Sequence, residues 1–115
     1  MSSKKGRRTV KKAIKLFTGR GYSVDTVEKK HRYAKARDLF SEECDGFDIV
    51  GISPEEFLLI QVKTNKPATQ KTYKEFAKKY GNDVVKVVVA TWYDHKGWRI
   101  QWYRPDGKII EEDLR

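Results

Sequence analysis

The sequence predicts an α/β fold, a mixed β-sheet flanked by helices, in a single domain over residues 1–115. Three patterns carry this prediction. Apolar residues recur at helical spacing over residues 7–18, short strands are paired over residues 45–63, and a continuous apolar run covers residues 84–92. A chain of this length can bury one hydrophobic core. The expected order is helix, three strands, helix, two strands.

The first element is an amphipathic helix. Residues 1–5 before it are polar and expected to be loose, and Gly19 and Gly21 supply its end. Residues 22–27 then alternate as a first strand. The apolar positions of the helix are Val10, Ala13, Ile14 and Phe17.

The centre of the chain, residues 45–63, reads as two short strands joined by turn residues at 51–54. Side chains alternate across a strand, so Gln61 and Lys63 share one face. Asp48 stands on the preceding strand between two core-forming residues. A carboxylate, an amide and a lysine inserted into apolar strands indicate a functional site.

The C-terminal half predicts a helix and more strands. The helix is expected to begin near Pro67 and to end before Gly81. Residues 84–92 predict a central strand covered on both faces. Residues 98–103 alternate as an antiparallel edge strand with one wet face, and residues 108–114 form a short strand or a fraying tail.

The chain is strongly basic, with 25 Lys and Arg against 16 Asp and Glu and a net charge of +9. Such an excess favours a polyanionic partner, nucleic acid before membrane. The alternative is a solubilising surface, or a heat-adapted one rich in ion pairs. The cations are concentrated in residues 4–15, which contain no acid.

Cysteine and histidine content excludes several kinds of site. Cys44 is the single cysteine, so neither an internal disulfide nor a cysteine-based metal cluster can form. This fits a reducing, cytoplasmic location. No apolar run approaches the roughly 18 residues of a membrane span. Cys44, His31 and His95 are explained more simply as structural or surface residues than as catalytic ones.

The stretch from 45 to 63 resembles the signature of the PD-(D/E)XK nuclease superfamily, with Asp48 as the aspartate and Gln61-Val62-Lys63 as the (D/E)-x-K element. The layout over most of the chain is similar to that of small archaeal-type Holliday junction resolvases. The resemblance implies a restriction-endonuclease-like core and a Mg²⁺-dependent endodeoxyribonuclease, with Mn²⁺ as a substitute, that cleaves branched DNA as a homodimer. The shared segments are Lys5-Gly6, the basic helix, Gly21-Tyr22, the motif strands, the second helix and Gly97-Trp98-Arg99.

The resemblance also implies roles for the motif residues. Asp48, the side-chain oxygen of Gln61 and the backbone carbonyl of Val62 would bind Mg²⁺, which prefers oxygen ligands and retains waters. Lys63 would orient or help deprotonate the attacking water and steady the phosphate. The alternatives are a turn-side or salt-bridged Asp48 and a Lys63 that reaches solvent from the strand end.

Two residues depart from the family pattern. The usual acid of the second motif is the neutral Gln61, and Val10 falls where related nucleases place a glutamate on the first helix. No acid occurs before Asp25. The site would therefore bind one metal weakly, take an acid from elsewhere, or be inactive. The candidates for an extra acid are Glu28 and Glu43, followed by Glu42 and Asp45.

DNA contacts are expected from cations near the motif and on the first helix, by backbone charge and shape rather than base sequence. Tyr73 either faces the substrate or packs in the core. An inactive DNA-binding module and a nuclease acting on duplex or flapped DNA are the alternative functions. The expected DNA-contacting residues are Lys5, Arg7, Arg8, Lys11, Lys12, Arg32, Lys35, Arg37, Lys66 and Gln70.

A homodimer is implied by the resemblance, since a four-way junction is cut at two symmetric points. The sequence supports this through an aromatic-rich pair of C-terminal strands, because exposed aromatic faces are frequently subunit interfaces. The aromatics are Trp92, Trp98, Trp102 and Tyr103.

Overall fold

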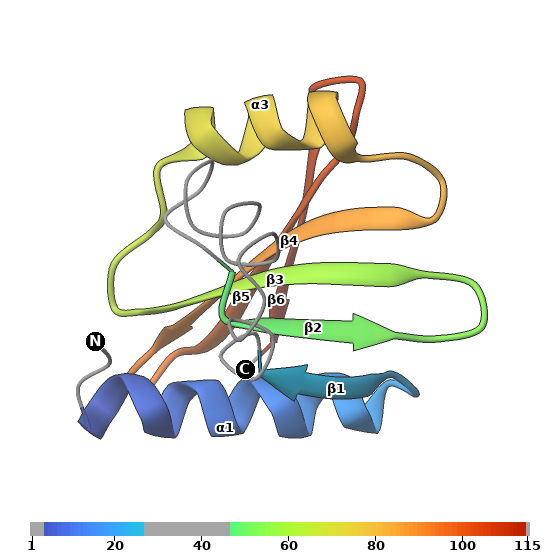
Figure 1. Ribbon diagram of the computed structural model, residues 1–115. Helices are drawn as coiled ribbons and strands as arrows, with labels where there is room; N and C mark the ends of the chain where they lie inside the picture. The colour runs from blue at the N-terminus through green and yellow to red at the C-terminus, as the bar shows by residue number, and fades with distance from the viewer. Residues whose placement is uncertain (1–3, 27–46, 115) are drawn as a thin grey trace.

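The computed structural model describes residues 4–26 and 47–114. These residues form a six-stranded sheet with one helix on each face (Figure 1). This architecture confirms the predicted α/β class, a sheet flanked by helices. In chain order the elements are α1 (Lys4–Gly19), β1 (Ser23–Thr26), β2 (Ile49–Ile52), β3 (Phe57–Thr64), α3 (Gln70–Tyr80), β4 (Val85–Tyr93), β5 (Gly97–Tyr103) and β6 (Ile109–Leu114).

The strands lie in the sheet in sequence order, from β1 to β6. Each neighbouring pair is antiparallel except β3 and β4, which run parallel and are joined through α3. A parallel pair needs a crossover of this kind, whereas antiparallel strands can be joined by short turns. The sheet is therefore mixed, as predicted, and the carboxyl ends of β3 and β4 lie side by side.

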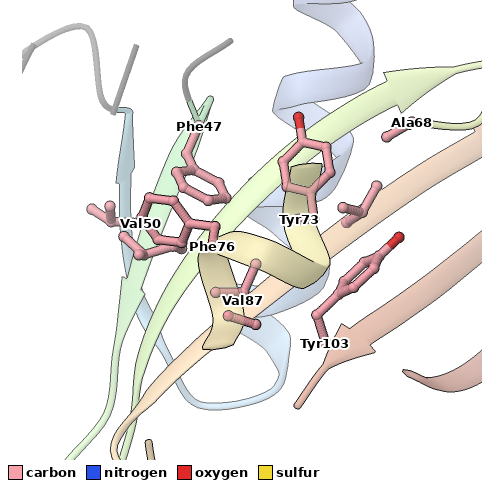
Figure 2. Packing of buried hydrophobic residues seen from close by; sticks show 10 residues of the cluster. Phe47, Val50, Ala68, Tyr73, Phe76, Val87 and Tyr103 are labelled. Atoms are coloured by element: carbon pink, nitrogen blue, oxygen red, sulfur yellow. The ribbon is translucent and has the colours of Figure 1, made fainter. Parts of the chain in front are cut away.

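Two hydrophobic clusters fill the spaces between the sheet and the helices. On one face, Tyr73 and Phe76 of α3 pack against Phe47, Val87 and Tyr103 (Figure 2). Each fully buried side chain of this size stabilises the fold by about 1.5–3 kcal/mol. Tyr73 is thus a core residue, which decides between its two expected roles. The cluster against α1 includes Ala13, Phe17, Ile49, Ile60, Val88 and Ile100.

Strand β4 is buried on both faces, as predicted from an apolar run interrupted only by Lys86. Val87 and Val89 belong to the cluster under α3, and Val88 and Ala90 belong to the cluster under α1. All four are essentially inaccessible. Such a strand can only lie at the centre of a covered sheet.

Of the two alternatives for residues 108–114, the strand is confirmed. Residues 109–114 pair with β5 along its length, so the expectation of β5 as the edge strand was wrong and β6 forms the edge. The aromatic side chains are also packed within the chain. Trp98 and Tyr103 are buried, and Trp92 and Trp102 are half-buried against the α1 cluster. The expectation of an exposed aromatic face was wrong, because alternation sends these side chains to both covered faces of the sheet.

Both helices begin at positions that the sequence placed slightly differently. Helix α1 begins at Lys4, within the segment expected to be loose, and α3 begins at Gln70, three residues after Pro67. At the end of α1, the N–H of Gly21 donates to the carbonyl of Thr18. Gly21 has a φ of 97°, in the left-handed region that glycine adopts at helix ends.

Candidate active site

Asp48 lies immediately before β2 and is bonded to β3 through both its backbone and its side chain. Its N–H donates to the carbonyl of Ile60 at 2.9 Å. Its carboxylate Oδ2 accepts the N–H of Val62 at 2.8 Å. The carboxylate oxygen accepts a strand N–H in place of a backbone carbonyl, at the point where the regular β2–β3 pairing ends. This fixes the carboxylate against the strand that carries the rest of the motif.

Gln61 stands between the buried Ile60 and Val62 and faces the same side of the sheet as Lys63. Its Oε1 atom is buried and has no hydrogen-bond partner among the described residues. An unsatisfied buried acceptor costs about 1–3 kcal/mol. A hydrated cation or a water molecule would satisfy it.

The predicted motif residues lie around one hollow of about 380 Å³. Asp48, Gln61 and Lys63 line it together, with Lys66 from the loop after β3. The structure therefore brings a carboxylate, an unsatisfied amide oxygen and two lysines to one place. The remaining lining residues are Gly6, Val10, Val62 and Thr64.

Helix α1 closes one side of this hollow without supplying an acid. Val10 presents an aliphatic wall. The hydroxyl of Thr64 donates to that of Thr9 at 2.8 Å, which fastens α1 to the end of β3. Nothing in the sequence signalled this bond between residues 55 positions apart. Among the described residues around the hollow, Asp48 supplies the one carboxylate.

The donor set fits a single hydrated divalent cation. Mg²⁺ is held in proteins by one or two carboxylates with further oxygens and retained waters. Asp48 and the Oε1 of Gln61 provide such oxygens, and the buried, unsatisfied state of Oε1 is what a missing partner would leave. No cluster of three or more His, Cys, Asp or Glu side chains occurs within residues 4–26 and 47–114. A tightly held pair of metals does not fit these residues.

Several expected site residues lie outside the described ranges. These are the candidate acids Glu28 and Glu43, the further acids Glu42 and Asp45, the cations Arg32, Lys35 and Arg37, and also His31 and Cys44.

The other expected DNA contacts in the described ranges are carried by α1 and α3. Arg7, Arg8 and Lys11 are exposed on α1, which also carries Lys5. The ammonium of Lys12 lies 4.0 Å above the ring of Trp92. Gln70 lines a separate hollow on α3, with Lys71, Lys74 and Lys78, and does not line the motif hollow.

The loop after β3 carries a feature that sequence reasoning missed. Asn65 adopts a φ of 57° and exchanges two hydrogen bonds with Asp94, in the turn between β4 and β5. An asparagine directly after a strand was the available signal, since asparagine tolerates the left-handed region. Its partner, 29 positions away, could not be identified from spacing.

Comparisons with known proteins give a likeness of fold. The sequence matches no family model and no curated protein. Among solved structures, it is similar to Hjc of Archaeoglobus fulgidus, a Holliday junction resolvase from an archaeal hyperthermophile. The TM-score is 0.54 at 19% sequence identity, over 95% of this chain and 84% of that chain. In the described ranges, neither helix is long and apolar enough to cross a membrane. The chain thus has the restriction-endonuclease-like fold of a resolvase nuclease.

Proposed function

We propose that this chain is a Mg²⁺-dependent, structure-selective endodeoxyribonuclease, a Holliday junction resolvase that hydrolyses phosphodiester bonds in branched DNA. One observation carries the proposal. Asp48, Gln61 and Lys63 line a single hollow, and the buried Oε1 of Gln61 has no hydrogen-bond partner among the described residues. The fold shared with an archaeal resolvase supports it.

Each residue has a role in the proposed reaction. Asp48 and Gln61 hold the cation, with the carbonyl of Val62 as a further ligand. A bound Mg²⁺, or Mn²⁺ in its place, supplies charge neutralisation at the phosphate and a more acidic water. Lys63 orients the attacking water and steadies the negative charge of the phosphate, and its ammonium lies on the same strand face as Gln61.

The DNA is held by its phosphate backbone. The net charge of +9 and the exposed cations of α1 supply an attraction that does not depend on base sequence. Of the cations expected to contact DNA, Lys66 is the one that is seen to line the motif hollow in the described part of the chain. Binding that rests on several neutralised phosphates weakens steeply with added salt.

A homodimer would carry out the paired cuts. Each chain contributes one motif hollow, in which Asp48 is the carboxylate among the described residues, and a four-way junction presents two equivalent strands related by a two-fold axis. Sedimentation of the protein with and without junction DNA measures this state directly. A monomer bound to a junction would contradict it.

The second candidate is a DNA-binding module that retains the fold without cleavage. Val10 and Gln61 favour it, because they line the hollow beside Asp48 with an aliphatic side chain and a neutral amide. Mg²⁺ binds less tightly to such a set than to two or three carboxylates.

A single set of incubations tests the proposal. The protein is mixed with labelled four-way junction, duplex and flapped DNA, each with Mg²⁺, with Mn²⁺ and with chelator. Paired symmetric nicks in the junction alone, dependent on metal, are expected. Cuts in duplex or flap would indicate another nuclease of this fold. Tight junction binding without cleavage under either metal would indicate the binding module.

A further inference from the structure

The loop that carries Lys66 is fastened to the turn between β4 and β5. The side-chain amide of Asn65 donates to Asp94 Oδ2 at 2.9 Å, and the N–H of Asp94 donates back to Asn65 Oδ1 at 2.9 Å. The N–H of Asn65 also donates to the carbonyl of Trp92 at 2.7 Å. We call this pair of hydrogen bonds, one between the two side chains and one from the backbone N–H of Asp94 to the Asn65 side chain, the Asn65–Asp94 clasp. It determines where the chain leaves β3.

The backbone of Asn65 turns the chain at this point. Its φ of 57° lies in the left-handed region, which asparagine enters more readily than most residues with a Cβ. The next residue, Lys66, lines the motif hollow. A residue at 65 must therefore tolerate this conformation and also provide both a donor and an acceptor to the neighbouring turn. Asparagine meets the three requirements together.

Asp94 also connects to helix α1. Its Oδ1 accepts the indole N–H of Trp92 at 3.2 Å. The ring of Trp92 in turn lies beneath the ammonium of Lys12, 4.0 Å from the ring centroid, a distance at which the two attract. One carboxylate thus bonds both Asn65, which precedes Lys66, and Trp92, which contacts Lys12 of α1.

We propose that the Asn65–Asp94 clasp is a positioning device that holds Lys66 where it contacts a DNA phosphate at the active site. This inference rests on the proposed function, because it requires DNA to occupy the hollow. Asp94 is a positioning residue and not a catalytic one, since it acts through Asn65 and does not line the hollow.

Because Asp94 is negatively charged, the proposal and its alternative predict opposite changes in DNA affinity when Asp94 is replaced. An aspartate near bound DNA repels phosphate, so its removal should tighten DNA binding if it has no other role. If it positions Lys66, Asp94→Ala should weaken binding to junction DNA. Loss of one phosphate contact corresponds to about a five- to tenfold weakening near 0.1 M salt and to a salt slope shallower by about 0.9.

The matched control is Asp106→Ala. Asp106 is also an exposed aspartate in a turn between antiparallel strands, where its side chain accepts the N–H of Lys108 at 2.9 Å. It lies at the opposite end of the sheet, between β5 and β6. Its removal deletes the same charge and should leave binding unchanged or slightly tighter.

A double-mutant cycle separates positioning from general destabilisation. Binding and salt slope are measured for Lys66→Ala, Asp94→Ala and the double variant. The double variant should bind no more weakly than Lys66→Ala alone. Asn65→Gly keeps the left-handed backbone and removes both hydrogen bonds of the clasp, so it should weaken binding at least as much as Asp94→Ala, and it serves if the latter does not fold. Asp94→Asn keeps one side-chain oxygen that can accept from Asn65 but loses the second acceptor, so it should bind DNA more tightly than Asp94→Ala.

The outcomes distinguish this inference from the proposed function. If Lys66→Ala weakens binding while Asp94→Ala and Asn65→Gly tighten it, the clasp is overturned and DNA binding stands. The inference is also overturned if the losses of binding free energy in Lys66→Ala and Asp94→Ala add up in the double variant. If Lys66→Ala has no effect although the protein binds junction DNA, Lys66 is not a phosphate contact and the inference is wrong. Absence of DNA binding by the unmodified protein overturns the proposed function itself.

Discussion

The two ends of the sheet are held together in different ways. At one end, three side chains each cap a turn made by their own neighbours. Ser53 accepts the N–H of Glu56, Asn82 accepts that of Val85 and Asp106 accepts that of Lys108, at 2.8–3.0 Å. The turn end also has a bond between distant segments, from Tyr22 to Glu56, but at the site end three such bonds come together. These bonds are Asp48 to Val62, Asn65 to Asp94 and Thr64 to Thr9, at sequence separations of 14, 29 and 55.

This difference explains where the chemistry can reside. A turn capped by its own residues forms without reference to the rest of the fold. A site assembled from the ends of several elements exists only when all of them are packed in place. Removing a side chain at the turn end should therefore lower only the free energy of unfolding. Removing one at the site end should first lower cleavage or DNA affinity.

The largest effect is expected for Asp48→Asn. Asparagine can still accept the N–H of Val62, so the fold should persist, but the one carboxylate of the described hollow is lost. A metal supplies several kcal/mol at the transition state, so cleavage should fall by about a thousandfold while junction affinity stays within a few-fold. Single-turnover cleavage and equilibrium binding measure the two quantities. Unchanged cleavage would mean that Asp48 has no part in the reaction.

Lys63→Ala should come next. Loss of a positioned proton-transfer or charge-stabilising group costs about a hundredfold or more in rate. The matched control is Lys86→Ala, since Lys86 is a half-buried strand lysine near the turn end of β4. The control should cleave at nearly the normal rate. Equal rates for the two variants would remove Lys63 from the mechanism.

Gln61→Glu tests whether the site is limited by its neutral amide. A carboxylate there should bind the cation more tightly, and cleavage should be preserved or raised by a few-fold. Without metal, the new charge faces Asp48 and should lower the melting temperature, which added Mn²⁺ should then restore. Asn82→Asp makes the same chemical change at the turn end and should show no response to Mn²⁺. A total loss of cleavage would mean that the cation lies elsewhere.

The two ends also differ in how much of their structure could be predicted from the sequence. Residue types and local periodicity indicated the helices, the central β4 and the facing of Gln61 and Lys63 on one strand. They left residues 108–114 open between a short strand and a fraying tail, because a short polar-apolar run gains its strand character from pairing with β5. Nor could they reveal the Asn65–Asp94 clasp, whose partners meet only after β3 and β4 align.

A smaller effect is expected for Asn82→Ala at the turn end. The side chain accepts the N–H groups of Val84 and Val85, each at 2.8 Å, in an exposed turn. Water can replace these bonds in part, so the free energy of unfolding should fall by about 1 kcal/mol. Denaturant titration measures this loss. Cleavage and DNA affinity should be unchanged, and a drop in either would contradict the division between the two ends.

Tyr22→Phe should give the smallest effect, visible only at alkaline pH. Burial, and then the hydrogen bond to Glu56, raise the pKa of Tyr22 to about 12. The unfolded chain loses this proton near its ordinary pKa of about 10, so stability falls as pH rises from about 10 towards 12. Tyr103, whose pKa burial also raises to about 12, keeps contributing to that fall when Tyr22 is replaced. The decline in denaturant midpoint between pH values near 9 and 11 should therefore be smaller in Tyr22→Phe but still present. Identical declines in the two proteins would show that Tyr22 ionises as readily in the folded chain as in the unfolded one. The contact between Tyr22 and Glu56 of the β2–β3 turn would then be weaker than its 2.5 Å hydrogen bond implies.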